Sequence, residues 1–235
     1  MEQIYTIPIN EVFDRGREDA TCGCPICLLR ERLEENELDL ILGASMMEPD
    51  IRIKTNEQGF CRRHYGGMIK MKNRLGLALM LESHLAEVQK GLKDSLLSTL
   101  IGKKREAPVK RIEKMESSCY ICGKVDYHLT RTVDNLTELY LTDEDFRKKY
   151  AAQTYFCLPH ARAMLDIAKR NMSGKEYAAF CDATMAIERA YLDKLSGDVS
   201  WFCKKFDYRY DAEPWYDSKD AIERAAAFLT GRQKD

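Results

Sequence analysis

Cys24-Pro25-Ile26-Cys27 is followed by Phe60-Cys61-Arg62-Arg63-His64, whose cysteine lies 34 positions after Cys27. The same order recurs as Cys119-Tyr120-Ile121-Cys122 and Phe156-Cys157-Leu158-Pro159-His160, in which Cys157 lies 35 positions after Cys122. The first motif repeats at an offset of 95 and the second at an offset of 96, so one inserted residue brings all eight cysteines and histidines into register. A single Cys-x-x-Cys is weak evidence for a site. Two copies, each with its own Cys-x-x-His, indicate two sites of the same design.

These residues have the chemistry and spacing of a tetrahedral metal site. Two residues between ligands let one tight turn or first helical turn aim both side chains at one ion, and four ligands need two such pairs. We expect each half of the chain to assemble its own set of three cysteines and one histidine. The expected sets are Cys24, Cys27, Cys61 and His64 in the first half, and Cys119, Cys122, Cys157 and His160 in the second.

The donor set favours two Zn²⁺ ions in closed, structural sites, where metal binding contributes directly to folding stability. An iron–sulfur cluster is one alternative, since cysteine with histidine also binds such clusters. Metal-free thiols that exchange disulfides are a second alternative. A redox motif of that kind is expected beside a βαβ pattern, and this sequence shows none.

The chain has nine cysteines, an odd number that is clustered rather than spread as in a disulfide framework. Cys22 has no counterpart in the second copy, because Ser117 occupies the matching position. We interpret Cys22 as a spare thiol rather than a substitute ligand. Cys181 and Cys203 lie within helical patterns and are predicted to be buried small apolar residues.

The chain between the motifs is predicted to be helical almost throughout. Apolar residues over positions 29–40 indicate a first helix that Gly43 can end. Apolar residues recur at steps of three and four over 71–96, which predicts one long helix after His64, and again over 177–195. Ser173 and Glu176 form a predicted capping box for the later helix.

The expected architecture is all-α, with two tandem helical repeats that each contain one Cys₃His metal site. We divide the chain into a first repeat at 1–102, a linker at 103–118, a second repeat at 119–200 and a C-terminal segment at 201–235. The linker is basic, and Pro108 is expected to interrupt any helix there.

The C-terminal segment has the densest aromatic stretch of the chain, with seven rings within 16 residues: Trp201, Phe202, Phe206, Tyr208, Tyr210, Trp215 and Tyr216. Aromatic rings beside basic residues can form a partner-binding surface. The candidate contact residues are Trp201, Lys204, Lys205, Arg209 and Trp215. The rings can equally fix the C-terminal tail and its last helix on the two repeats, which is the interpretation we favour.

Composition narrows the class of protein. The 235 residues are 45% apolar and 32% charged, with 37 basic and 38 acidic residues and a net charge of −1. No overall field therefore draws the chain to nucleic acid or to an anionic membrane. No membrane-length apolar run and no signal-peptide pattern is visible, so we expect a cytoplasmic protein. A protein partner is favoured, a nucleic-acid partner is possible but not favoured, and no membrane partner is expected.

The pattern resembles a prokaryotic domain-of-unknown-function family with twin Cys-x-x-Cys…Phe-Cys-x-x-His motifs. That family also has an aromatic segment that matches Phe206-Asp207-Tyr208-Arg209. The resemblance covers about residues 5–231 and implies bacterial or archaeal origin, but it implies no activity.

No catalytic motif is found, so an enzyme is not favoured. The function expected from the sequence is a zinc-binding, non-enzymatic helical protein that acts as a binding or regulatory module. The alternatives are a thiol-based redox or metal sensor, and an iron–sulfur electron-transfer or accessory protein.

Overall fold

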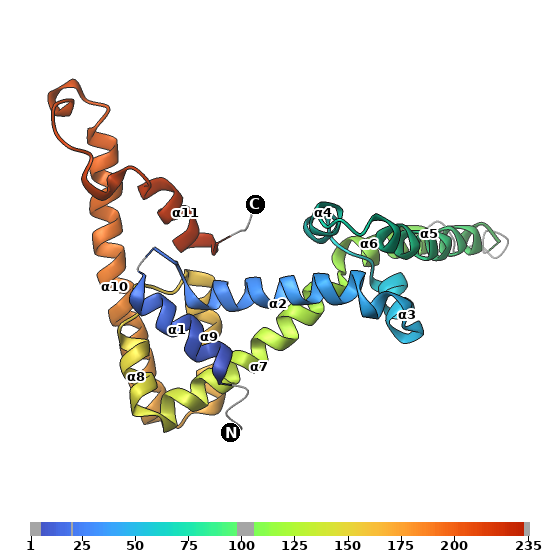
Figure 1. The fold of residues 1–235 in the computed structure, drawn as a ribbon, viewed down its shortest axis with the longest axis horizontal. Helices are drawn as coiled ribbons and strands as arrows, with labels where there is room; N and C mark the ends of the chain where they lie inside the picture. The colour runs from blue at the N-terminus through green and yellow to red at the C-terminus, as the bar shows by residue number, and fades with distance from the viewer. Residues whose placement is uncertain (1–5, 20, 98–105, 233–235) are drawn as a thin grey trace. The chain divides into compact units, whose positions relative to one another are not determined.

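The computed structural model describes residues 6–19, 21–97 and 106–232. Over these residues the regular structure is helical and no strand is present, which confirms the all-α prediction (Figure 1). None of the described helices is long and apolar enough to span a membrane.

The chain forms two compact units. The first unit comprises residues 1–31 and 129–235, and the second comprises residues 32–128. These limits differ from the divisions at 102 and 118 expected from the repeat. The chain passes between the units within two helices, α2 (Pro25–Leu42) and α7 (Tyr120–Thr142), which each begin at a Cys-x-x-Cys motif. Gly123 therefore lies in the first turn of a helix rather than in a separate metal-binding turn.

The first unit packs its helices around an aromatic core. It contains α1 (Ile7–Glu18), α8 (Glu144–Ala151), α9 (Leu158–Asn171), α10 (Gly174–Lys204) and α11 (Ala221–Thr230). Five fully buried rings meet in the core, with neighbouring centroids 4.9–6.1 Å apart: Phe13, Phe146, Tyr150, Phe156 and Phe180. The buried Tyr150 hydroxyl lies 2.7 Å from the hydroxyl of Thr184, which satisfies its polar end.

The Ser173–Glu176 capping box at the start of α10 is confirmed, because both reciprocal hydrogen bonds are present. Near the C-terminus, α11 packs on α9 and α10. Its Phe228 is 2% exposed and lies against the stacked pair Tyr155 and Tyr191. The last helix is thus part of the first unit.

The second unit contains η2 (Ala44–Met47), α3 (Pro49–Gln58), α4 (Arg62–Lys70), α5 (Arg74–Leu97) and α6 (Glu106–Ser117). Its core includes buried residues of α2, α4, α5 and α7, among them Ile41, Met68, Leu77, Met80 and Ile121. α2 ends at Leu42, directly before Gly43, as predicted.

Two helix predictions in the second unit are corrected. The chain after His64 forms two helices rather than one, because α4 ends at Lys70 and α5 begins at Arg74; α5 matches the long helix expected over 71–96 except for its first three residues. Asn73 explains the break: its side-chain oxygen accepts from the Gly76 N–H at 2.8 Å, which caps α5. The predicted linker contains α6, which packs on α3 and α5. Pro108 falls in the first turn of α6, where a missing N–H is tolerated. The basic residues 103–105 lie outside the described residues.

Candidate metal centres

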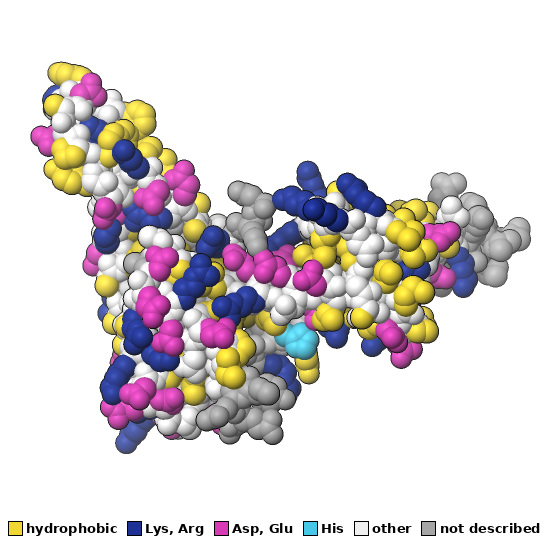
Figure 2. Space-filling view, in the orientation of Figure 1, with side chains coloured by type: hydrophobic (Ala, Val, Ile, Leu, Met, Phe, Trp, Pro, Cys, Tyr) yellow, Lys and Arg dark blue, Asp and Glu magenta, His cyan; other side chains and the backbone are white. Residues whose placement is uncertain are grey.

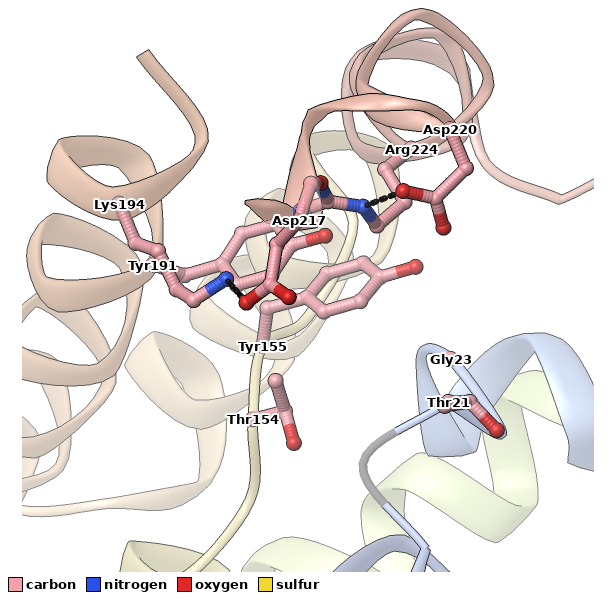
Figure 3. Close-up of a pocket in the computed structure, with 9 residues that line it drawn as sticks. All are labelled: Thr21, Gly23, Thr154, Tyr155, Tyr191, Lys194, Asp217, Asp220 and Arg224. Carbon is pink, nitrogen blue, oxygen red and sulfur yellow. Dashed lines mark hydrogen bonds and ion pairs between the residues drawn. The ribbon is translucent and has the colours of Figure 1, made fainter. Parts of the chain in front are cut away.

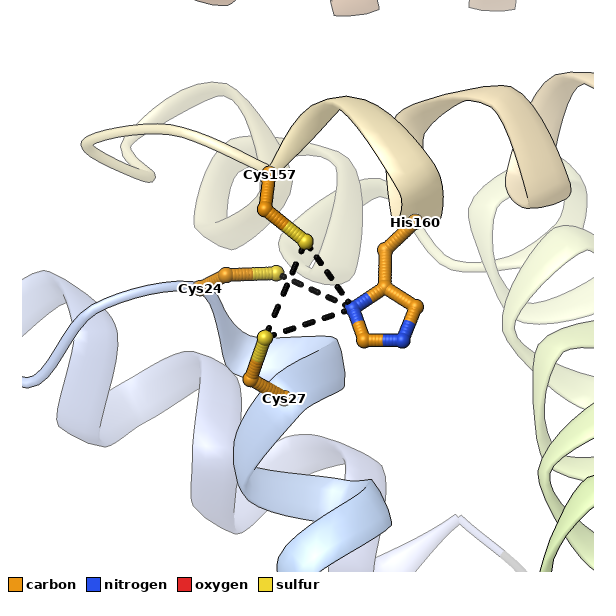
Figure 4. A group of neighbouring side chains, drawn as sticks. All are labelled: Cys24, Cys27, Cys157 and His160. Atoms are coloured by element: carbon orange, nitrogen blue, oxygen red, sulfur yellow. Dashed lines mark hydrogen bonds between the residues drawn. The ribbon is translucent and has the colours of Figure 1, made fainter. Parts of the chain in front are cut away.

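The first cluster of metal-binding side chains, called here the Cys24 cluster, comprises Cys24, Cys27, Cys157 and His160. The His160 Nδ1 lies 3.8, 3.4 and 3.1 Å from the sulfurs of Cys24, Cys27 and Cys157, respectively. The Cys27 and Cys157 sulfurs are 3.7 Å apart. All four side chains point to one common point between the start of α2 and the start of α9 (Figure 4).

Local structure places these ligands. Cys24 precedes α2, Pro25 is the first residue of that helix, and Cys27 lies in its first turn. Proline suits this position, because the first helical N–H has no intrahelical acceptor. Cys157 is the N-cap residue of α9, and His160 follows in its first turn. Both ligand pairs therefore stand at helix N-termini, where the aligned peptide dipoles stabilise thiolates.

The second cluster, called here the Cys61 cluster, comprises Cys61, His64, Cys119 and Cys122. The His64 Nδ1 lies 3.3 Å from the Cys61 sulfur and 3.1 and 3.5 Å from the sulfurs of Cys119 and Cys122. The Cys61 and Cys122 sulfurs are 3.9 Å apart. Cys61 is the N-cap residue of α4, while Cys119 and Cys122 stand at the start of α7.

The predicted grouping of the ligands is wrong. Each cluster combines the Cys-x-x-Cys of one half of the chain with the Cys-x-x-His of the other half. The eight residues found from the sequence are all brought into the two clusters, but the partners are exchanged. The physical reason is that α2 and α7 each begin at a Cys-x-x-Cys and then lead the chain into the other compact unit. The Cys-x-x-His that follows in the sequence therefore lies in a different unit from that Cys-x-x-Cys.

The separations within both clusters fit a tetrahedral zinc ion. Zn–S bonds of about 2.3 Å and Zn–N bonds of about 2.0 Å at tetrahedral angles put sulfurs ~3.8 Å apart and sulfur and nitrogen ~3.5 Å apart. The sulfur–sulfur distances of 3.7 and 3.9 Å and the sulfur–nitrogen distances of 3.1–3.8 Å bracket these values. The donor type, number and spacing of both clusters therefore suit one metal ion each.

The two clusters differ in their access to solvent. All four residues of the Cys24 cluster are buried, whereas Cys61, Cys119 and Cys122 are partly exposed. The C-terminal end of the described chain covers the Cys24 cluster, since the Arg232 backbone N–H donates to the Cys27 sulfur at 3.4 Å. The Arg232 side chain also donates to the Cys22 carbonyl at 3.2 Å. Three thiolates around a divalent metal ion leave a net negative charge on the site. The Arg232 backbone N–H and the positive charge of its side chain would offset that charge.

A carboxylate supports the histidine of the Cys61 cluster. The Nδ1 of His64 faces the sulfurs, and its Nε2 lies 2.8 Å from the Oε1 of Glu34 on α2. Glu34 is buried, and its other oxygen pairs with Arg63. Sequence reasoning did not find Glu34, because it lies among several acidic residues on α2 and nothing in its spacing sets it apart. Such an outer carboxylate fixes the ring tautomer and strengthens nitrogen as a ligand.

Without a metal ion, the side chains of the Cys61 cluster hold a thiolate against a protonated imidazole, and metal binding would release the remaining protons. Burial lowers the pKa of His64, but the Cys119 thiolate and Glu34 outweigh it and raise that pKa to about 10. Burial raises the pKa of Cys119, but the interaction with His64 outweighs it and lowers the value to about 6. Burial and the neighbouring sulfurs raise the pKa of Cys122. Several thiolates cannot coexist here without a cation, which a divalent metal supplies.

A cavity of about 450 Å³ adjoins the Cys24 cluster, between residues 21–23 and the segment that leads to Cys157 (Figure 3). Tyr155 and Tyr191 stack with centroids 4.2 Å apart along its wall. The charged side chains at its rim pair with one another: Lys194 contacts Asp217 at 3.0 Å, and Arg224 contacts Asp220 at 2.9 Å.

Other cysteines lie outside the two clusters. Cys22 is 4% exposed and its sulfur lies 3.6 Å from the Gly23 carbonyl oxygen, in line with a spare thiol. The predicted burial of Cys203 is wrong, because this residue is exposed, and Cys181 is only partly buried. Both lie on α10, whose outward faces remain solvated along much of its length.

The predicted contact residues of the C-terminal segment mostly make internal contacts. Lys205 is 7% exposed, and its Nζ donates to the carbonyls of Tyr210, Asp211 and Glu213 at 2.7, 3.1 and 2.7 Å. The Trp201 indole donates to the Pro214 carbonyl at 3.0 Å.

The remaining three contact candidates also have neighbours within this segment. Trp215 lies against Phe202, Lys204 stands over the Trp201 ring, and Arg209 pairs with Asp207. The rings thus close the loop on the end of α10. Phe206 and Tyr208 stay 77% and 85% exposed.

The fold and the two clusters define an all-helical protein with two candidate Cys₃His metal centres. The chain belongs to the family of unknown function DUF6062, whose sequence model matches residues 1–235. This agrees with the resemblance to a domain-of-unknown-function family stated from the motifs. No curated protein and no solved structure shows a match to the chain.

Proposed function

We propose that this protein binds two zinc ions as structural centres and acts as a non-enzymatic binding or regulatory module. The observation that carries the proposal is the pair of four-ligand clusters, each with three sulfurs and one imidazole nitrogen around one point. Three thiolates and one neutral imidazole match zinc by softness and by number. Four protein ligands leave no open position on a tetrahedral ion for substrate or water.

In this role each metal ion fixes the ends of the helices that hold it, and a partner binds the surface that those helices form. The Cys24 cluster ties α2 to α9, and the Cys61 cluster ties α4 to α7. Each tie joins segments more than 50 residues apart in the chain, so metal binding removes much conformational freedom. We expect a protein partner and function inside the cytoplasm.

Elemental analysis tests the metal directly. Protein purified without added metal should contain two zinc ions per chain and negligible iron, and it should be colourless after anaerobic purification. Removal of zinc by a strong chelator should lower the melting temperature and helicity. Iron with visible absorption would replace this proposal by an iron–sulfur protein, and a metal-free protein of unchanged stability would refute it.

A thiol-based sensor is the second candidate, and the Cys61 cluster is the observation that favours it. Three of its ligands are partly exposed, so oxidants and competing chelators can reach its sulfurs. The fully buried Cys24 cluster would then keep the first unit folded while the Cys61 cluster responds.

A further inference from the structure

Positive charge is concentrated on one short stretch that contains half of the Cys61 cluster. Residues 59–81 include five basic residues and no acidic residue: Arg62, Arg63, Lys70, Lys72 and Arg74. The net charge of −1 for the whole chain conceals this excess. Lys and Arg side chains gather over α4 in the space-filling view (Figure 2).

Helix geometry puts Arg62 and Lys70 on the outward side of α4, and Lys72 and Arg74 follow within four residues of its end. Arg62, Gly66 and Lys70 recur at steps of four and share one face, whereas the buried His64 and Met68 lie on the opposite side. We call Arg62, Lys70, Lys72 and Arg74 the α4 basic surface. All four residues are exposed, and within the described part of the chain their side chains make no ion pair or hydrogen bond. Arg63, by contrast, pairs with Glu34.

The repeat supplies an internal comparison. At the offset of 96 that aligns the two Cys-x-x-His motifs, Arg62 and Arg63 correspond to Leu158 and Pro159, and Lys70 corresponds to Asp166. The Cys24 cluster assembles with the same donor set without any of these cations. The cations on α4 are therefore not required for a Cys-x-x-His helix to hold its ligands, and they need another explanation.

Gly66 leaves the centre of this surface flat. A methyl group placed on its Cα would meet no atom within 4 Å, so packing does not require glycine there. The next residue differs, because the same methyl on Gly67 would approach Leu38 to 3.2 Å. An open glycine between Arg62 and Lys70 lets an extended anion approach the helix backbone closely.

We propose that the α4 basic surface binds the phosphate backbone of a nucleic acid. Unpaired, exposed cations along α4 and the turn that follows it suit a row of phosphates. An acidic folded protein fits less well, because this face lacks the exposed aromatic anchor that dominates protein interfaces. Tyr65, the aromatic residue of α4, packs edge-on against Phe60 and is half-buried. The proposal rests on the proposed function, since the metal bound by Cys61 and His64 would fix the start of α4.

Fluorescence anisotropy with the intact zinc-loaded chain tests the surface. The probes are a labelled 20-nucleotide RNA, a 20-base-pair DNA duplex and a polyglutamate peptide of matched charge. Affinity for at least one nucleic acid should fall with salt, with a slope of log K on log salt of about −3 to −4 for four phosphate contacts. The double variant R62E/K70E should weaken binding at least tenfold.

The repeat-equivalent helix α9 gives the matched control. Its Arg162 and Lys169 are exposed, so R162E/K169E changes the same charge on a surface where Arg162 already pairs with Asp166. This control should bind as the wild type does. A milder variant, K70A/K72A, should reduce the slope of log K on log salt by about 2. If this variant still binds both zinc ions, the weaker binding cannot be explained by unfolding.

Three outcomes would overturn the proposal: no binding at 50 mM salt, equal loss in both charge-reversed variants, or polyglutamate binding as tight as that of the nucleic acids. Zinc content is measured on every sample. A protein that contains two zinc ions but does not bind nucleic acid would refute this inference and leave the proposed function intact. A protein without zinc would instead refute the proposed function.

Discussion

The sulfur of Cys27 lies 3.7 Å from the sulfur of Cys157, although 130 positions separate the two residues in the chain. The pair joins the first half of the sequence to the second half. The Cys61 cluster has the same character, since Cys61 and Cys122 are 61 positions apart and their sulfurs are 3.9 Å apart. Each metal centre would therefore close a long loop of chain.

Paired cysteine variants should reveal which ligands share an ion. We expect Cys27→Ser and Cys157→Ser each to remove about one zinc ion, and the double variant to remove no more than one. Cys27→Ser combined with Cys61→Ser should remove both ions, because these residues belong to different clusters. Zinc content by mass spectrometry gives the count. If the Cys27/Cys157 double variant lost both ions and the Cys27/Cys61 double variant lost only one, the ligands would be grouped within each half of the chain instead.

Glu34 should strengthen metal binding only at the Cys61 cluster. Glu34→Gln keeps the size of the side chain but removes the charge 2.8 Å from the His64 Nε2. We expect zinc affinity at this cluster to fall about 10- to 100-fold, with the Cys24 cluster unaffected. Competition with a calibrated chelator measures both affinities. Asp39→Asn, on an exposed position of the same helix, is the control and should leave both affinities unchanged.

Peroxide should act on the Cys61 cluster first. Hydrogen peroxide takes two electrons from a pair of thiolates, such as Cys61 and Cys122, which then form a sulfur–sulfur bond while the peroxide is reduced to water. The bond consumes two metal ligands, so zinc is released. We expect one zinc ion to leave early, with oxidation mapped to the partly exposed cysteines, and the second ion to persist. Earlier oxidation of the buried Cys24 cluster would contradict the exposure argument.

A buried carboxyl should make stability depend on pH. Glu188 is 6% exposed; its Oε1 accepts from the Phe156 N–H at 3.0 Å, and its Oε2 has no hydrogen-bond partner among the residues that the structure describes. Burial raises the pKa of Glu188 to about 7 from its ordinary value of 4.5. The folded state therefore binds this proton more tightly than the unfolded state. The resulting stability is complete below pH 4.5 and is lost as the pH rises through about 7.

The variant Glu188→Gln tests this dependence, because the amide oxygen still accepts from Phe156 but does not ionise. Relative to the wild type, the variant should gain stability as the pH rises from 5.5 to 8, by at most about 1.4 kcal/mol for each unit of pKa shift. Urea unfolding of the zinc-loaded proteins at both pH values gives the difference. Parallel pH profiles for the two proteins would show that Glu188 does not titrate in this range.

Lys205 should hold the C-terminal aromatic loop together. Lys205→Met removes a buried ammonium that donates to three backbone carbonyls, and it leaves those carbonyls without their donor. We expect residues 206–218 to lose protection from hydrogen exchange, and the local stability to fall by roughly 2–3 kcal/mol. Lys204→Met changes an exposed neighbour and should have little effect. If Lys204→Met reduced the hydrogen-exchange protection of residues 206–218 as much as Lys205→Met does, the buried ammonium of Lys205 would not be what holds this loop.

Local signals in the sequence predicted much of the molecule. The helical periodicity, the end of α2 before Gly43 and the Ser173–Glu176 capping box depend on residues within one or two turns, and the structure confirms them. The break before Arg74 was missed because Asn73, which caps α5, interrupts an apolar pattern that continues on both sides. Pro108 was misjudged, since proline disrupts a helix interior but is tolerated in its first turn.

The eight cysteine and histidine residues were also identified from sequence alone, because ligand spacing is a local property that duplication repeats. Their grouping was not, because two identical motifs can combine in either of two ways with the same local geometry. Tertiary structure decides between them: α2 and α7 each begin at a Cys-x-x-Cys and lead the chain into the other unit, so each Cys-x-x-Cys stays in the unit that holds the Cys-x-x-His of the other half. Burial, the Glu34 contact and the open face of α4 follow from that packing, which no short stretch of sequence encodes.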